Sequence, residues 1–289
     1  MKPILITGAG GLLGANLVVD CARLGLPVSG IDRSVCDLTD AAMTTRVIRE
    51  IEPSHIIHTA ALTHVDWCEN HPEETWHSNV DASRTLAQIA QTIGAGIVYI
   101  STDSVFDGAR GFYGEADDPR PLNVYAKSKL AGERAVLAEA PDALIVRTVI
   151  YGWNLRAKRS FAEWILSHLT AGSEVPGFDD AVFSPILVND LGRLLLALLE
   201  RRASGVCHVA AGEAWTKFEF ARAVAKTFGF NPAQVRRASL RSAAMIAPRP
   251  LNTSLDTSYA SRLLGTALPR VWEGLARFRE AAQGEYACV

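Results

Sequence analysis

The sequence predicts an α/β fold with a doubly wound parallel sheet and a second, smaller C-terminal lobe. Three observations predict this fold. Short apolar runs alternate with longer amphipathic stretches over the first 150 residues, a glycine-rich turn follows the first apolar run, and the alternation stops near residue 150. Alternating strand and helix patterns are typical of parallel sheets that carry helices on both faces.

Within residues 1–150, each apolar run predicts a strand and each amphipathic stretch predicts a helix. We expect strands at 4–6, 28–31, 56–58, 97–100 and 143–147. We expect helices at 14–24, 41–51, 72–93 and 125–138. Right-handed crossovers would distribute these helices over both faces of one sheet.

The pattern changes over residues 151–289, where we expect the smaller lobe. Helices are expected at 161–169, 188–201 and 217–228, and a strand at 206–209. We expect a segment near 186–212 to return to the first domain, and the rest to form a lobe beside the sheet.

Charge and cysteine usage exclude several classes of protein. The formal net charge of the 289 residues is -2, which offers no basic excess for nucleic acid. No segment reaches the ~18 uncharged apolar residues of a membrane span, so we expect no membrane partner. The odd, scattered cysteines form no CxxC pair, which indicates reduced thiols, no metal site and a cytoplasmic protein. These cysteines are Cys21, Cys36, Cys68, Cys207 and Cys288.

Glycines follow the first expected strand and precede the first helix. Gly8, Gly11 and Gly14 have GxxGxxG spacing, and Leu12 and Leu13 open the helix. A tight turn and a close backbone approach both require residues without Cβ, and the helix N-terminus presents free N–H groups to phosphate. The sequence therefore predicts a Rossmann-type dinucleotide-binding domain over residues 1–150.

The end of the second expected strand bears on the choice of cofactor. Asp32 lies about 20 residues beyond the loop, where a carboxylate accepts hydrogen bonds from the adenosine ribose of NAD. Arg33 beside it suits the 2′-phosphate of NADP, so the sequence leaves NAD and NADP both open. Asp37 and Leu38 follow as candidate adenine contacts.

A tyrosine and a lysine stand four residues apart in an expected helix. Tyr125 and Lys129 would lie on one helix face, where an ammonium lowers the pKa of a neighbouring phenol. Thr102 directly follows an apolar strand, at the sheet edge where such folds bind ligands. The three residues would supply a carbonyl orienter, a phenolic proton and a cation, with hydride from a nicotinamide.

With these motifs the chain resembles the extended short-chain dehydrogenases/reductases and is most similar to the dTDP-4-dehydrorhamnose reductases. The resemblance covers nearly the whole chain. Its motifs are TGAGGLLG (7–14), HTAALTHVDWCE (58–69), STDSVFDG (101–108), PLNVYAKSKLAGE (121–133), RTVIYG (147–152) and RPLNTSLDTSYASRLLG (249–265).

The resemblance implies roles for further residues. Thr102, Tyr125 and Lys129 match the catalytic positions, and Tyr125 and Lys129 would also contact the cofactor. The stretch along the cofactor would be Thr59, Ala60 and Ala61. The residues that flank the sugar or its diphosphate would be Thr63, Val65, Ser104, Val105, Phe106, Arg249 and Asn252. Asn79 would lie near the active site or pack against backbone.

Two positions depart from the family pattern. Val149 stands where these reductases usually carry a tryptophan near the sugar, and Ser184-Pro185-Ile186 replaces their usual Pro-Thr. Both positions lie near the expected substrate pocket, so they leave the identity of the sugar open without affecting the cofactor.

The resemblance implies an NAD(P)H-dependent reductase of a 4-keto nucleotide-activated deoxysugar in dTDP-rhamnose or related carbohydrate biosynthesis. Ser104 stands where the related dehydratases carry a catalytic glutamate, which disfavours a dehydratase. Two alternatives stay open: a nucleotide-sugar epimerase, and a non-catalytic NADP-binding regulatory subunit like the methionine adenosyltransferase beta subunit. The oligomeric state also stays open, with a homodimer as one expectation.

Overall fold

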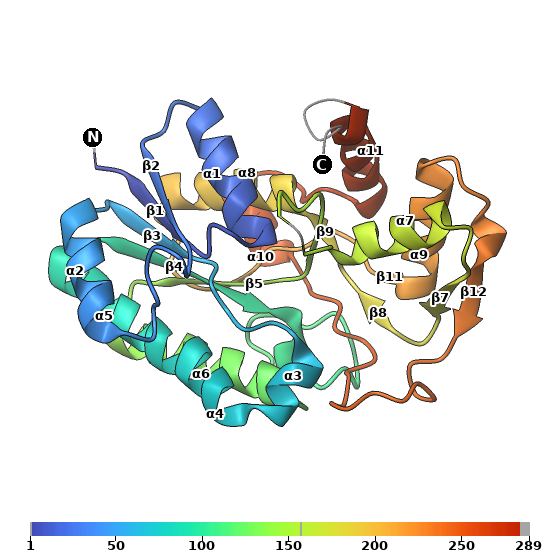
Figure 1. Ribbon diagram of the computed structural model, residues 1–289, viewed down its shortest axis with the longest axis horizontal. Coiled ribbons are helices and arrows are strands. Elements are labelled where there is room, and N and C mark those ends of the chain that lie inside the picture. The colour runs from blue at the N-terminus through green and yellow to red at the C-terminus, as the bar shows by residue number, and fades with distance from the viewer. Residues whose placement is uncertain (1, 157, 284–289) are drawn as a thin grey trace.

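A computed structural model describes residues 2–156 and 158–283 of the chain. Its centre is a parallel six-stranded sheet with the order β10-β5-β4-β3-β1-β2 (Figure 1). The strands are β1 (Ile4–Thr7), β2 (Val28–Ile31), β3 (His55–His58), β4 (Gly96–Thr102), β5 (Leu144–Thr148) and β10 (Gly205–His208). The predicted doubly wound α/β fold is confirmed.

The chain reverses its direction across the sheet beside β1. It passes from β1 to β2 on one side and then returns to β3 on the other. Thr7 pairs in register with both Ile31 and His58, so the carboxyl ends of these strands lie together. Ligands of doubly wound sheets bind in the crevice at such a switch point.

Helices cover both faces of the sheet (Figure 1). One face packs Ile6 and Val98 beneath the helices α1 (Leu12–Arg23) and α8 (Val188–Glu200). The other packs Leu5 and Tyr99 beneath α2 (Ala41–Ile51), α5 (Ala82–Ile93) and α6 (Val124–Glu139). Adjacent residues of β1 thus enter opposite cores, as strand geometry requires.

The expected helical region 72–93 contains three successive segments. They are α4 (Pro72–Trp76), a π-helical turn (His77–Asp81) and α5. A short helix, α3 (Val65–Asn70), precedes them and was not predicted. π-Turns occur frequently at functional sites, and this one carries Asn79.

The second lobe lies beside the sheet (Figure 1). Its core joins α7 (Phe161–Thr170), α9 (Lys217–Thr227) and α11 (Val271–Gln283), with Phe220 and Phe278 fully buried between them. Its strands are short and pair two by two: β6 (Ile150–Tyr151), β7 (Val175–Phe178), β8 (Val182–Phe183), β9 (Ile186–Leu187), β11 (Trp215–Thr216) and β12 (Val235–Ala238).

Two late segments pack with the first domain. α8 lies on α1, and β10 adds an edge strand beside β5. A helix that was not predicted, α10 (Ser258–Leu264), packs on both of them. Asp190 lies inside the first turn of α8, where it is buried and pairs with Arg277 of α11.

Within the described ranges, none of the helices combines the length and the apolar character needed to cross a membrane. The same residues contain no cluster of His, Cys, Asp and Glu that could hold a metal ion. Four cysteines are free and buried, and Cys288 lies outside the described residues.

Candidate active site

The glycine loop has the geometry of a phosphate cradle. Gly8 has a φ of +70°, and a Cβ on Gly14 would lie 2.2 Å from the carbonyl oxygen of Gly8. Gly11 caps α1 without any side-chain hydrogen bond. The first N–H groups of the helix therefore face a surface that lacks side chains, which is the arrangement that binds a pyrophosphate.

A cavity of about 610 Å³ extends from this loop across the ends of β1, β2 and β3. Nine of the predicted cofactor residues line it: Gly8, Gly11, Asp32, Arg33, Asp37, Leu38, Thr59, Ala60 and Ala61. Trp67, Glu74 and His77 from α3 to the π-turn complete the wall, and the sequence analysis missed them. Trp67 lies in α3, which is too short for a helical period to reveal, and Glu74 and His77 lie in α4 and the π-turn that follow it.

Two charged residues line this cavity directly after β2. Asp32 accepts hydrogen bonds from the backbone N–H and the hydroxyl of Ser34, at 2.9 and 2.5 Å. These bonds hold the pKa of Asp32 below its usual value, so its carboxylate stays ionised. Arg33 pairs with Asp37 at 3.2 Å, but its side chain is 82% exposed and can turn toward a ligand.

A second cavity of about 410 Å³ adjoins the first and contains the predicted catalytic residues. Thr102, Tyr125 and Lys129 all line it. The other predicted residues in its wall are Gly11, Leu12, Leu13, Thr59, Ala61, Thr63 and Ser104. The walls of the two cavities share Gly11, Thr59 and Ala61, so a dinucleotide held by the glycine loop can reach both.

The phenol of Tyr125 keeps its proton in this structure. Burial raises the pKa of Tyr125 above its ordinary value, while a hydrogen bond with Thr102 acts in the opposite direction. The negative charge of Asp103 raises this pKa further. The net pKa of Tyr125 is therefore raised and not lowered, because burial outweighs the lowering expected from Lys129.

Lys129 is the buried cation of the site. Its ammonium lies 4.0 Å from the centre of the Tyr99 ring. Burial lowers the pKa of Lys129 to about 7, although the carboxylate of Glu133 opposes this shift. Glu133 in turn forms a buried ion pair with Arg147 of β5 at 2.7 Å.

Thr102 is held at the end of β4 by the turn that follows. Its hydroxyl donates to Asp103 at 3.1 Å and accepts from the backbone N–H of Ser104 at 3.2 Å. Asp103 also accepts from Thr253 at 2.5 Å, and its burial raises the pKa of this carboxyl. The threonine is therefore fixed in one orientation facing the cavity.

Val105 and Phe106 were predicted to flank the sugar, but they lie in the hydrophobic core behind the cavity of Tyr125. Both are fully buried in a small core cluster with Tyr113 and Leu130. Their side chains support the Thr102 turn from behind and are not part of either cavity wall. Val65 is the first residue of α3 and is not part of either cavity wall.

Asn79 adopts the second of its two expected roles. Its amide accepts from the N–H of Leu62 at 2.8 Å and donates to the carbonyl of Leu62 at 3.1 Å. It also donates to Ser128 of α6 at 2.9 Å. Asn79 packs against backbone and ties the segment after β3 to the helix that carries Tyr125.

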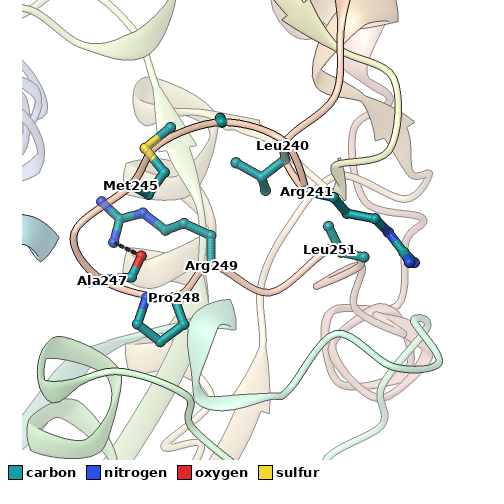
Figure 2. Close-up of a pocket in the computed structure, with 8 residues that line it drawn as sticks. Leu240, Arg241, Met245, Ala247, Pro248, Arg249 and Leu251 are labelled. Carbon is teal, nitrogen blue, oxygen red and sulfur yellow. Dashed lines mark hydrogen bonds between the residues drawn. The ribbon is translucent and has the colours of Figure 1, made fainter.

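The late loop with Arg249 forms a third cavity of about 410 Å³ (Figure 2). The guanidinium of Arg249 lies beside Met245 and donates to the carbonyl of Ala247 at 3.4 Å, whereas Arg241 points away from it. Arg249 also pairs with Asp66 at 3.0 Å. Asn252 bonds within its own turn, accepting from Ser254.

Polar residues of the segment before α7 also line the site, and they were not predicted from the sequence. Asn154, Lys158 and Arg159 line the cavity of Tyr125, and Lys158 donates to Thr63 at 3.0 Å. The basic run at 156–159 was the available signal in the sequence.

The fold and the site together define an NAD(P)-binding α/β protein of the extended short-chain dehydrogenase/reductase type. Residues 1–283 match the RmlD substrate binding domain family. The chain belongs to this family, which confirms the predicted resemblance.

Several relatives and solved structures are similar over almost the whole chain. A dTDP-4-dehydrorhamnose reductase of Mycobacterium tuberculosis is 37% identical over 88% of this chain and 84% of its own. A probable low-salt glycan biosynthesis reductase of Haloferax volcanii is 34% identical over 98% of both chains. The dTDP-4-dehydrorhamnose reductase of Bacillus anthracis, solved with NADP, is 31% identical, with a TM-score of 0.90 over 97% of this chain and 99% of that one.

A relative of a different kind also matches. The methionine adenosyltransferase 2 subunit beta of Danio rerio is 34% identical over 89% of this chain and 83% of its own.

Proposed function

We propose that this protein is an NAD(P)H-dependent reductase that acts on a 4-keto nucleotide-activated deoxysugar. The observation that carries the proposal is that Thr102, Tyr125 and Lys129 line one cavity, which shares part of its wall with the glycine cradle. The cradle fits a dinucleotide, because the absence of Cβ at Gly8 and Gly14 lets the turn approach Ala60 and lets the start of α1 approach the carbonyl of Gly8, where a Cβ would collide.

The proposed mechanism follows from the side chains around this cavity. A bound NAD(P)H supplies the hydride that reduces the carbonyl carbon. Tyr125 donates its phenolic proton to the carbonyl oxygen, and its raised pKa ensures that this proton is present at neutral pH. Thr102 orients the carbonyl, and Lys129 stabilises the negative charge left on the phenol.

We assign the sugar and nucleotide ends of the substrate to different parts of the molecule. Thr63, Ser104 and Lys158 surround the space next to Tyr125 and suit the sugar. Arg249 supplies a cation for the nucleotide end. In this proposal residues 1–150 and the returning segment near 186–212 bind the dinucleotide, and the remaining residues bind the substrate.

The direct test is oxidation of NADPH in the presence of a panel of 4-keto nucleotide sugars. We expect turnover with at least one of them. Tyr125→Phe should lower kcat by about 100-fold or more and change NADPH affinity little, because the glycine cradle still holds the pyrophosphate of the cofactor. An unchanged kcat would contradict the mechanism.

A non-catalytic regulatory subunit is the second candidate, because the methionine adenosyltransferase beta subunits are as similar to this chain as several reductases. Tight NADPH binding without turnover of any sugar in the panel would support this candidate over the reductase.

We also propose a cytoplasmic location, which the four free, buried cysteines support. A homodimer stays a prediction that sedimentation equilibrium tests.

A further inference from the structure

The short helix α3 places two carboxylates against two different segments of the chain. Asp66 accepts from the backbone N–H of Ala247 at 3.0 Å and pairs with Arg249 at 3.0 Å. Glu69, on the next turn, accepts from the backbone N–H of Val124 at 2.9 Å. α3 therefore connects the loop of residues 240–251 to the start of α6.

Asn123 connects the same two segments directly. Its side-chain oxygen caps α6 by accepting from Ala126 at 2.9 Å, and its amide nitrogen donates to the carbonyl of Pro248 at 2.9 Å. Asn123 is almost completely buried. Tyr125 follows two residues later, in the first helical turn that this cap stabilises.

The 240–251 loop alone provides all the residues that line the third cavity. Arg249 is the lining cation that points into the loop, and none of the lining residues is acidic, so the cavity suits an anionic group beside apolar surface. In Figure 1 this loop is the orange segment that runs from β12 along the lower edge toward α3. A ligand in the cavity would therefore contact the segment that Asp66 and Asn123 hold.

We propose that Asp66 and Asn123 are positioning residues that couple occupation of this cavity by the nucleoside diphosphate of the substrate to the placement of Tyr125. The inference rests on the proposed function. Its physical basis is that binding energy from a remote part of a substrate can be used to orient the reacting groups. The first turn of a helix is the part that frays most readily, so a firmly held 240–251 loop keeps Tyr125 in place.

A kinetic comparison separates coupling from simple support of the fold. Asn123→Ser keeps an oxygen that can cap α6 but removes the donor to Pro248. We expect kcat with the 4-keto nucleotide sugar to fall about tenfold, while kcat with the corresponding sugar 1-phosphate stays unchanged. An equal loss with both substrates would mean a purely structural role and would overturn the proposal.

Asp66→Asn tests the other connection. It keeps an acceptor for the N–H of Ala247 and removes the charge that holds Arg249. We expect a higher KM for the nucleotide sugar and an unchanged KM for the sugar 1-phosphate. The matched control is Asp118→Asn, which removes an exposed carboxylate that pairs with the exposed Arg120. An Asp66→Asn variant that behaves like this control would count against the coupling.

Hydrogen exchange provides a test that needs no turnover. Addition of dTDP should slow amide exchange at residues 124–127 in the wild type, and this protection should disappear in Asn123→Ser. A wild type whose helix start does not respond to dTDP would overturn the coupling. Failure of every 4-keto sugar to turn over, with this protection intact, would contradict only the proposed reductase function.

Discussion

At the scale of single residues, burial has opposite consequences for the two titratable groups of the site. It raises the pKa of Tyr125 and lowers that of Lys129 to about 7, because a buried environment disfavours the charged form of either group. Both shifts favour neutral side chains in the protein without ligand. A phosphate-bearing cofactor would bring negative charge near Lys129 and favour its ammonium form.

The shift at Lys129 predicts a pH-dependent cost in stability. Below pH 7 the folded state carries the full penalty of a buried ammonium, and this penalty disappears as the pH rises from 7 toward 10.5, because the folded state loses its proton first. Lys129→Met should therefore raise the free energy of unfolding by about 2 to 4 kcal/mol at pH 6 and by much less at pH 10. Urea unfolding at both pH values measures the difference.

The exposed Lys127 on the same helix is the matched control. Lys127→Met should change the free energy of unfolding little, and equally at both pH values. The same gain for Lys129→Met at pH 6 and pH 10 would show that its charge carries no penalty.

The position of Arg33 predicts that the protein prefers NADPH to NADH. Its exposed guanidinium can leave Asp37 for a 2′-phosphate, which only NADPH carries. Arg33→Gln should raise the KM for NADPH about tenfold and leave that for NADH nearly unchanged. Arg46→Gln, on the exposed side of α2, is the control. An equal increase in both KM values would show that Arg33 does not bind the 2′-phosphate.

At the scale of elements, the contact between β1 and α1 depends on the absence of a side chain at Gly14. A Cβ there would overlap the carbonyl of Gly8, which is backbone and cannot move aside. Gly14→Ala should lower the melting temperature and abolish NADPH binding in calorimetry.

Gly192 of α8 is a matched helical glycine, because a Cβ there would meet only ordinary contacts at 3.4 Å and beyond. Gly192→Ala should be neutral or stabilising by up to about 1 kcal/mol. Similar melting temperatures for the two variants would contradict a tight approach of α1 to β1.

Sequence patterns predicted the helices and strands that are long enough to contain several repeats of the hydrophobic pattern. The strands from β1 to β5 and the helices α1, α2, α6, α7, α8 and α9 agree with expectation to within about two residues at each end. The strands β6 and β9 contain two residues each, which is too short for an alternating hydrophobic pattern to predict them. No helix was predicted after residue 228, where α10 and α11 lie.

The residues of the site also fall into two groups: those that a local sequence pattern predicted and those that only the fold brings together. The glycine loop and the Tyr125–Lys129 pair are local patterns, so the sequence contained them. Asp66 and Arg249 are separated by most of the chain, and only packing of the 240–251 loop on α3 brings them together. Burial, which sets the pKa of Tyr125, is also a property of the folded chain and not of spacing.

At the scale of the whole molecule, the two lobes share segments. The chain leaves the sheet after β5, builds part of the second lobe, returns as α8 and β10, and crosses again to α9 before α10 returns. Asp190 of α8 pairs with Arg277 of α11 across this connection. The lobes should therefore unfold together.

Scanning calorimetry should show one transition, with a calorimetric enthalpy equal to the van't Hoff value. NADPH at 100 times its dissociation constant should stabilise the whole molecule by about 2.7 kcal/mol and shift this single transition. Two transitions, of which only one responds to NADPH, would show that the lobes are independent.

The position of β10 in the chain has a consequence for synthesis on the ribosome. The outer edge of β5 finds its partner only when residues 205–208 have emerged, long after the rest of the sheet is available. Until then the nascent chain presents an unpaired edge of apolar residues, which is a template for association with other chains. Stalled or truncated translation products that end before β10 are therefore the forms of this protein most in need of a chaperone.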